Sequence, residues 1–113
     1  MNIFTLKLSG TITIGNNDTQ LQHDVEAALE KGHDVIILEM RDLKYMDSSG
    51  IGCLAAAREL VVDQGAQLAL IGMTAKLRRL LGIMSFLELF QVYDSIEDAI
   101  QILHNREHAR SAA

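Results

Sequence analysis

The chain has 113 residues and a formal net charge of -5, with 49% hydrophobic and 22% charged residues. This is the composition of an ordinary globular protein, and the length suggests a single domain over residues 1–113. The acidic balance argues against a nucleic-acid-binding surface, and no apolar run reaches the roughly 18 residues that a membrane span requires.

Strands alternate with helices along the chain. Alternating or continuous apolar patterns predict strands at residues 3–8, 11–14, 34–40, 67–72 and 89–93. Apolar residues at helical spacing predict helices between residues 17 and 32, 49 and 64, 75 and 81, and 96 and 103. Helix-capping signals precede three of these helices: Asn17 with Gln20, Thr74, and Ser95 with Asp98.

The sheet is expected to be mixed. Only Ser9 and Gly10 separate the first two strands, and this turn signal favours an antiparallel hairpin. The later strands each follow a helix, which is typical of parallel pairing. The sequence therefore predicts a small α/β domain with a mostly parallel sheet of about five strands and about four helices. Residues from about 104 to 113 are expected to form a polar tail.

The stretch KYMDSSGIG lies where the third expected strand meets its helix. In open α/β sheets this carboxyl end of the strands is where ligand and partner sites gather. Ser48 or Ser49 is expected to cap the helix, and Asp47 places negative charge beside the positive end of the helix dipole. Gly50 and Gly52 each cost about 1 kcal/mol relative to alanine in a helix, which suggests a role other than stability.

Two interpretations of this stretch follow from physical chemistry. The first is a capped helix whose small residues allow tight packing. The second is a phosphorylatable serine at a helix N-terminus, where backbone N–H groups partly accommodate a phosphate. The residues alone leave both interpretations open.

The run from Asp42 to Gly52, DLKYMDSSGIG, resembles the signature of STAS domains, specifically of bacterial anti-sigma-factor antagonists. The preceding VIILEM run, the LSG turn at residues 8–10 and the MTAKLRRLL segment at 73–81 match that family in kind and order. The resemblance covers nearly the whole chain.

The resemblance implies a phosphorylation switch and no enzymatic activity, cofactor or metal. The family's regulatory serine directly follows the aspartate, which here is Ser48. The implied partners are an anti-sigma factor that is also a serine kinase and a PP2C-type phosphatase that removes the phosphate. Unphosphorylated protein would bind the anti-sigma factor, and phosphorylated protein would release it.

The implied partner-binding surface is formed by Asp47, Ser48, Ser49, Gly50, Ile51, Gly52 and Thr13. Thr13 stands where many family members carry an acidic residue. A strand that members usually have ahead of the LSG strand is not expected here. Both departures bear on the choice of partner, and the sequence leaves self-association into a homodimer open.

Several other readings are weaker. A constitutive STAS scaffold or transport-associated module is the first alternative, and a small hydrolase using Ser48 or Ser49 is the second, although DSSGIG does not fit the G-x-S-x-G elbow. His104 and His108 have the spacing of some zinc sites, but a polar chain end explains them better. The single cysteine, Cys53, is expected to be a small core residue, and its isolation fits a cytoplasmic protein.

Overall fold

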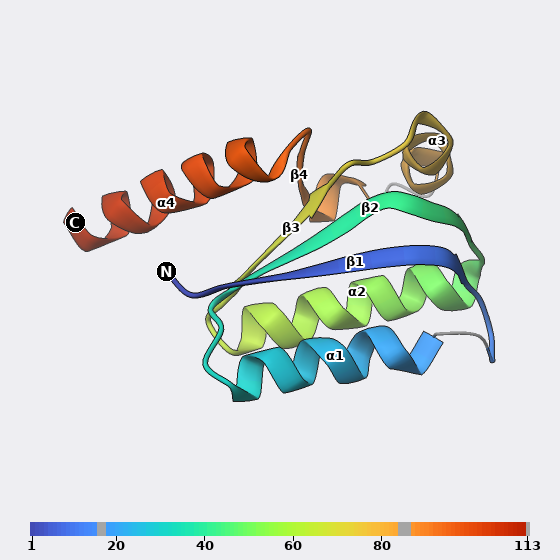
Figure 1. Ribbon diagram of the computed structural model, residues 1–113, viewed down its shortest axis with the longest axis horizontal. Helices are drawn as coiled ribbons and strands as arrows, with labels where there is room; N and C mark the ends of the chain where they lie inside the picture. The colour runs from blue at the N-terminus through green and yellow to red at the C-terminus, as the bar shows by residue number, and fades with distance from the viewer. Residues whose placement is uncertain (16–17, 84–86, 113) are drawn as a thin grey trace.

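The computed structural model describes residues 1–15, 18–83 and 87–112, which form a four-stranded sheet with helices against both of its faces (Figure 1). The strands are β1 (Ile3–Ile12), β2 (Val35–Met46), β3 (Gln67–Ile71) and β4 (Gln91–Tyr93). The helices are α1 (Asp18–Glu30), α2 (Ser48–Asp63), α3 (Ala75–Ile83) and α4 (Ile96–Ala112), with a 3-10 turn, η1 (Leu87–Leu89), before β4.

The strands lie in the order β1-β2-β3-β4, and every neighbouring pair is parallel. The predicted α/β fold class is confirmed, but the expected antiparallel hairpin is wrong. Residues 3–12 form one strand that pairs with β2 along its length. Ser9 and Gly10 lie between two shifts of register, and Gly10 has a φ of 68°. These residues therefore bend a continuous strand instead of reversing it, and the described sheet has four strands instead of about five.

The strand β2 is longer than the sequence predicts. The apolar run ends at Met40, yet the strand continues to Met46 because the second half of β1 pairs with it there. Pairing with β3 stops earlier, at Glu39 opposite Ile71. The ends of β1 and β2 thus form a two-stranded extension beyond the rest of the sheet, and this extension leads directly into α2 (Figure 1).

Of the three helix caps predicted outside the KYMDSSGIG stretch, two are confirmed. The Thr74 hydroxyl accepts a hydrogen bond from the Leu77 N–H at 3.2 Å, and the Ser95 hydroxyl accepts one from the Asp98 N–H at 3.2 Å. Each satisfies a backbone donor that has no partner within the first helical turn. The third cap rests on Asn17, which lies outside the described residues.

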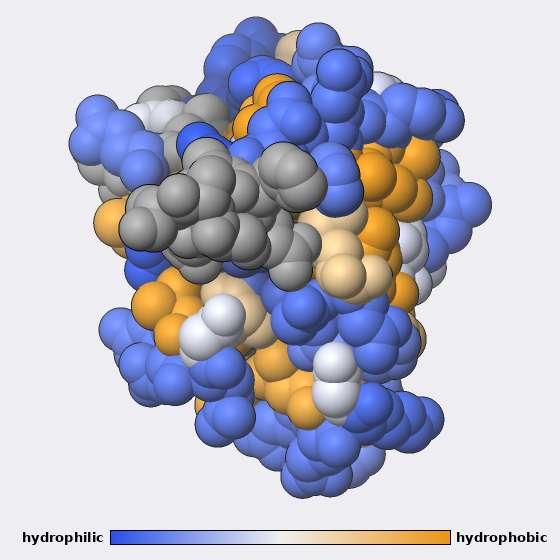
Figure 2. Space-filling view, turned by 90° about the vertical axis from the view of Figure 1, so that its left-hand side faces the viewer, coloured by the Kyte–Doolittle hydropathy of each residue, from blue (hydrophilic) through white to orange (hydrophobic). Residues whose placement is uncertain are grey.

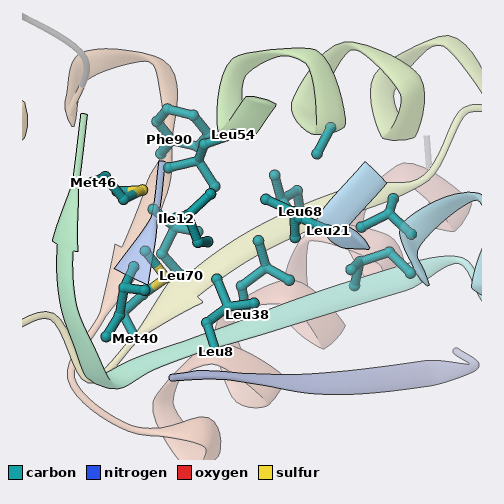
Figure 3. Packing of buried hydrophobic residues seen from close by; sticks show 14 of the residues in the cluster. Leu8, Ile12, Leu21, Leu38, Met40, Met46, Leu54, Leu68, Leu70 and Phe90 are labelled. Carbon is teal, nitrogen blue, oxygen red and sulfur yellow. The ribbon is translucent and has the colours of Figure 1, made fainter. Parts of the chain in front are cut away.

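Two apolar clusters hold the layers together. The larger cluster fills the space between the sheet and the helices α1 and α2 (Figure 3). In it, Leu8, Leu38 and Leu70 from three neighbouring strands lie against Leu21 and Leu54 from the two helices. The smaller cluster, on the other face, packs Val35, Ile37, Ala69 and Ile71 against Ala99 and Leu103 of α4. Because β2 contributes to both clusters, its central residues are buried on both faces, as the sequence predicts.

Helix α4 continues to Ala112, so the part of the predicted polar tail that the structure describes is helical.

On the end of the molecule seen in Figure 2, where the strands begin, hydrophobic residues are scattered among hydrophilic ones. Within the described ranges, no helix combines the length and the apolar character needed to cross a membrane.

Candidate functional site

The KYMDSSGIG stretch spans the end of β2 and the first turn of α2. Lys44, Tyr45 and Met46 belong to the strand, and α2 begins at Ser48. Only Asp47 separates the two elements. The sharp change from strand to helix places this site at the carboxyl end of the sheet, on the right-hand side of Figure 1.

Asp47 is the residue that caps α2. Its backbone is extended, with φ -91° and ψ -173°, and its Oδ1 accepts a hydrogen bond from the Gly50 N–H at 2.9 Å. The sequence assigned this role to Ser48 or Ser49, and that assignment is wrong because the strand pairing to Met46 leaves the aspartate at the boundary. Aspartate is as favourable at this position as serine.

The same carboxylate fastens the end of β1 to the helix. Asp47 Oδ2 accepts a hydrogen bond from the Ile14 N–H at 3.1 Å, and the Asp47 N–H donates to the Ile12 carbonyl at 3.4 Å. Residues 12–15, called the strap from here on, are therefore held across the start of α2. Thr13, half-buried, lies between these two attachment points and so beside the site.

These hydrogen bonds affect the acidity of Asp47. The Gly50 N–H, followed by the Ile14 N–H, lowers the pKa of the carboxyl from its ordinary value, against a smaller opposing effect of desolvation. A carboxyl whose pKa is lower in the folded state stabilises the fold above its unfolded pKa. That stabilisation is lost as the pH falls through the folded pKa.

The Asp47→Asn variant is therefore expected to be less sensitive to acid than the wild type. Urea unfolding followed by circular dichroism, at pH about 7 and at pH about 2.5, brackets the ordinary aspartate pKa of about 3.9. The wild type should lose more stability between these conditions than Asp47→Asn does, since asparagine keeps a capping oxygen but carries no charge. Asp63→Asn, an exposed residue at the other end of α2, is the matched control and should follow the wild type. Equal losses of stability in Asp47→Asn and the wild type would contradict the lowered pKa of Asp47.

The two glycines have different surroundings. A Cβ on Gly50 would overlap the Ile12 carbonyl oxygen and lie 3.0 Å from its carbonyl carbon, so only glycine fits beneath the strap. A Cβ on Gly52 would meet no atom within 4 Å, and Gly52 is exposed. Close packing within the fold thus explains Gly50, and it gives no reason for Gly52.

The remaining residues expected in the site divide between surface and core. Ser48 is exposed and Ser49 is half-buried, whereas Ile51 is only 2% exposed and belongs to the larger apolar cluster. The structure thus brings Thr13, Asp47, Ser48 and Gly52 together at the surface, and it places Gly50 and Ile51 inward.

Sequence reasoning missed two exposed apolar side chains at this end of the molecule. Ile14, in the strap, is 79% exposed, and Tyr45, at the end of β2, is 44% exposed. The alternation of residues 11–14 places Ile12 and Ile14 on the same buried face, but the strand ends at Ile12. No signal in the sequence distinguishes the two isoleucines.

The weaker candidate groups gain little from the structure. Cys53 is half-buried on α2. The side chain of His108 lies outside the described part of the chain, so its predicted spacing to His104 has no geometry to assess. Among the described side chains, no three of the histidine, cysteine, aspartate and glutamate residues are placed to hold a metal ion.

The fold and this strand-to-helix site define the class of protein. The STAS domain family model matches residues 1–99, and the chain belongs to that family. The anti-sigma F factor antagonist of Paenibacillus polymyxa is 24% identical to this chain over 98 residues, covering 87% of this chain and 84% of that protein.

Solved structures share the fold at low sequence identity. SpoIIAA, an anti-sigma factor antagonist, superposes in its unphosphorylated form with a TM-score of 0.69 at 20% identity, covering 91% of this chain and 90% of that one. The phosphorylated form of Bacillus SpoIIAA superposes with a TM-score of 0.66 at 18% identity, covering 90% of this chain and 91% of that one. A sulfate transporter family protein from Wolinella succinogenes superposes with a TM-score of 0.77 at 24% identity, covering 88% of this chain and 83% of that one. These likenesses establish the fold of the chain.

Proposed function

We propose that this protein is an anti-sigma-factor antagonist that changes partners when Ser48 is phosphorylated. The observation that carries this proposal is the position of Ser48. Its side chain is exposed on the first turn of α2, directly after the capping Asp47 and close to the open surface at Gly52. The similarity to an anti-sigma F factor antagonist, and to a SpoIIAA structure named as phosphorylated, supports the same role.

The partners follow from this role. The unphosphorylated protein binds an anti-sigma factor that is also a serine kinase, and it thereby frees a sigma factor. The kinase transfers a phosphate to Ser48 and the complex separates; a PP2C-type phosphatase then restores the binding form. The protein itself acts by binding, as one STAS domain over the whole chain, in the cytoplasm.

The surroundings of Ser48 explain why a phosphate would act on the partner more than on the fold. A phosphate carries about -1.5 to -2 charges at neutral pH. The Gly50 N–H, which could help to accommodate it at the helix N-terminus, already donates to Asp47. The phosphate would therefore stand beside an existing carboxylate and project outwards. We expect little change in the backbone between the two forms.

The surface that the partner contacts includes the strap as well as α2. Asp47 holds Thr13 and Ile14 next to Ser48, so a partner seated over the serine also meets the exposed Ile14 side chain. Ser49 and Gly52 complete this surface on α2. Gly50 and Ile51 contribute by positioning the first turn, since both are buried.

Phosphorylation at Ser48 is tested directly by mass spectrometry. Incubation with ATP and each kinase-type anti-sigma factor of the source organism should add one phosphate to the wild type. The Ser48→Ala variant should remain unmodified, and the neighbouring Ser49→Ala variant, as the control, should still accept the phosphate. Modification of Ser49 instead, or no modification by any such kinase, would refute the proposal.

A transport-associated or scaffold role is the second candidate, favoured by the fold shared with the Wolinella succinogenes protein. Such a module would bind its partner whatever the charge at position 48. A small hydrolase is a third and weaker candidate. It would show esterase turnover that disappears in Ser48→Ala. Charge-independent binding and esterase turnover are both distinct from the expected phosphorylation of Ser48.

A further inference from the structure

The outer edge of β1 is open. In the described part of the chain, β1 is the first strand of the sheet and pairs only with β2. The Asn2 carbonyl accepts a hydrogen bond from the Val35 N–H of β2 at 3.2 Å. Because the backbone groups of successive residues point to opposite edges of a strand, Ile3, Thr5 and Lys7 direct their N–H and C=O groups away from β2. These groups can template a further strand.

The side chains along this edge are apolar on the face covered by α1. Phe4 and Leu6 are only half-buried, although both pack against the larger core cluster. A groove of about 150 Å³ follows the edge between β1 and α1, with Leu6 and Leu8 on the strand side and Gln20 and Asp24 on the helix side. An added strand would cover the exposed parts of Phe4 and Leu6.

The helix beside this edge has a negative side chain near its middle, and a positive side chain directly follows its last residue. One side of this segment presents four residues at helical spacing: Gln20, Asp24, Ala27 and Lys31. The Gln20 side chain donates a hydrogen bond to the Asp24 carboxylate at 2.8 Å. Asp24 lines the groove near the middle of β1, whereas Lys31 adjoins Gly32, whose carbonyl accepts from the Asn2 side chain at the start of β1. A negative and a positive group thus flank the small Ala27.

We propose that the partner at this edge is a second copy of the chain, whose β1 pairs antiparallel with this one around a two-fold axis at Thr5. In such a symmetric interface each contact occurs twice. Thr5 faces Thr5 of the second copy, and Ile3 faces Lys7 of the second copy. Both are hydrogen-bonded pairs. Phe4 faces Leu6 of the second copy at a non-hydrogen-bonded position, where side chains approach most closely.

The same axis brings together the two α1 helices, and the Lys31 that follows each of them, with complementary charge. Because the two-fold axis makes the two helices antiparallel, Asp24 of each copy faces Lys31 of the other. The two Ala27 residues meet between these pairs and allow the helices to approach. Neither the strand pairing nor the helix pairing requires a like charge to face its copy.

The regular part of β1 limits the extent of the interface. The first shift of register lies between Lys7 and Ser9, so pairing is confined to the strand before it. The Lys7 ammonium lies 3.6 Å from the Asp42 carboxylate of β2, which draws it away from the outer edge. The axis reverses the strand direction, so the two Ser48 sites point to opposite ends of the dimer and both remain accessible.

Sedimentation equilibrium over a range of protein concentrations tests the interface. The wild type should show a monomer–dimer equilibrium. Thr5→Pro removes an outward N–H while leaving the β1–β2 ladder intact, and it should weaken the dimer at least tenfold, or about 1.4 kcal/mol. Thr5→Val, which keeps the N–H, should dimerise as the wild type does. Circular dichroism confirms that each variant is folded.

Charge exchange on α1 provides an independent check on the surface. Asp24→Lys and Lys31→Asp should each weaken the dimer, and the double variant should restore it. In a Cys53→Ala background, Thr5→Cys should form a covalent dimer under oxidation, whereas Ser9→Cys should not. A wild type that remains monomeric at every concentration overturns the proposal. So does a dimer that Thr5→Pro and the single charge variants leave unchanged.

Discussion

Replacing Gly50 with alanine is expected to destabilise the fold by about 3 kcal/mol or more. The new methyl group would overlap the Ile12 carbonyl oxygen, and neither group can move freely. One belongs to a helix and the other to the paired end of β1, and Asp47 ties the two together through the 3.4 Å and 3.1 Å hydrogen bonds to Ile12 and Ile14. Relief would require the strap to lift from the helix, at the expense of these hydrogen bonds.

Gly52→Ala is the matched control for Gly50→Ala. It introduces the same methyl group two residues later, where no atom lies within 4 Å. Alanine is favoured over glycine in a helix, so Gly52→Ala should stabilise the protein by about 0.5–1 kcal/mol. Urea unfolding monitored by circular dichroism measures both changes. Similar stability for the two variants would contradict the close contact between the strap and α2.

Gly52→Ala also separates stability from binding. Gly52 weakens its own helix, and an added methyl group there would meet no atom within 4 Å, so the isolated fold gives no reason for a glycine at this position. The proposed partner surface gives it one, because a flat first turn admits close approach. The affinity of Gly52→Ala for the anti-sigma factor should fall even though its stability rises. This opposite pair of effects would not follow from damage to the fold.

The sequence was most informative where structure depends on a few neighbouring residues. Thr74 and Ser95 cap their helices as predicted, and the strands around Ile36 and Leu70 follow from local apolar patterns. The hairpin prediction failed for a non-local reason. Ser9 and Gly10 suit a turn and a bulge equally well, and pairing with the distant β2 decides between them.

The site shows the same division between local and distant causes. The apolar spacing predicted a helix from residue 49, one residue after its observed start at Ser48, because this signal lies within the helix itself. The choice of Ser48 as the phosphorylated residue rests on the resemblance of the DSSG motif and stays a prediction. The capping role of Asp47 could not be assigned, because it depends on where β2 ends, and β1 determines that end. The reason for Gly50 lies in Ile12, 38 positions earlier in the chain.

Phosphorylation of Ser48, or its mimic Ser48→Asp, should reduce the affinity for the anti-sigma factor about 100-fold, which corresponds to about 2.7 kcal/mol. The physical reason is electrostatic. Asp47 already provides one negative charge, and the Gly50 N–H that could neutralise a second one is occupied. A partner surface that accepts a neutral serine would then have to desolvate and face two adjacent negative groups, and such an arrangement costs several kcal/mol.

Isothermal titration calorimetry with the purified anti-sigma factor measures this effect. Ser48→Ala should retain tight binding, since it keeps the site neutral, and Ser48→Asn controls for the size of the side chain. Ser95→Asp, also at a helix N-terminus but on α4, should bind as the wild type does. Because the mechanism acts through charge at an exposed position, the stability of Ser48→Asp should differ little from that of the wild type. Tight binding by Ser48→Asp would instead favour the scaffold role, in which the charge at this position has no influence.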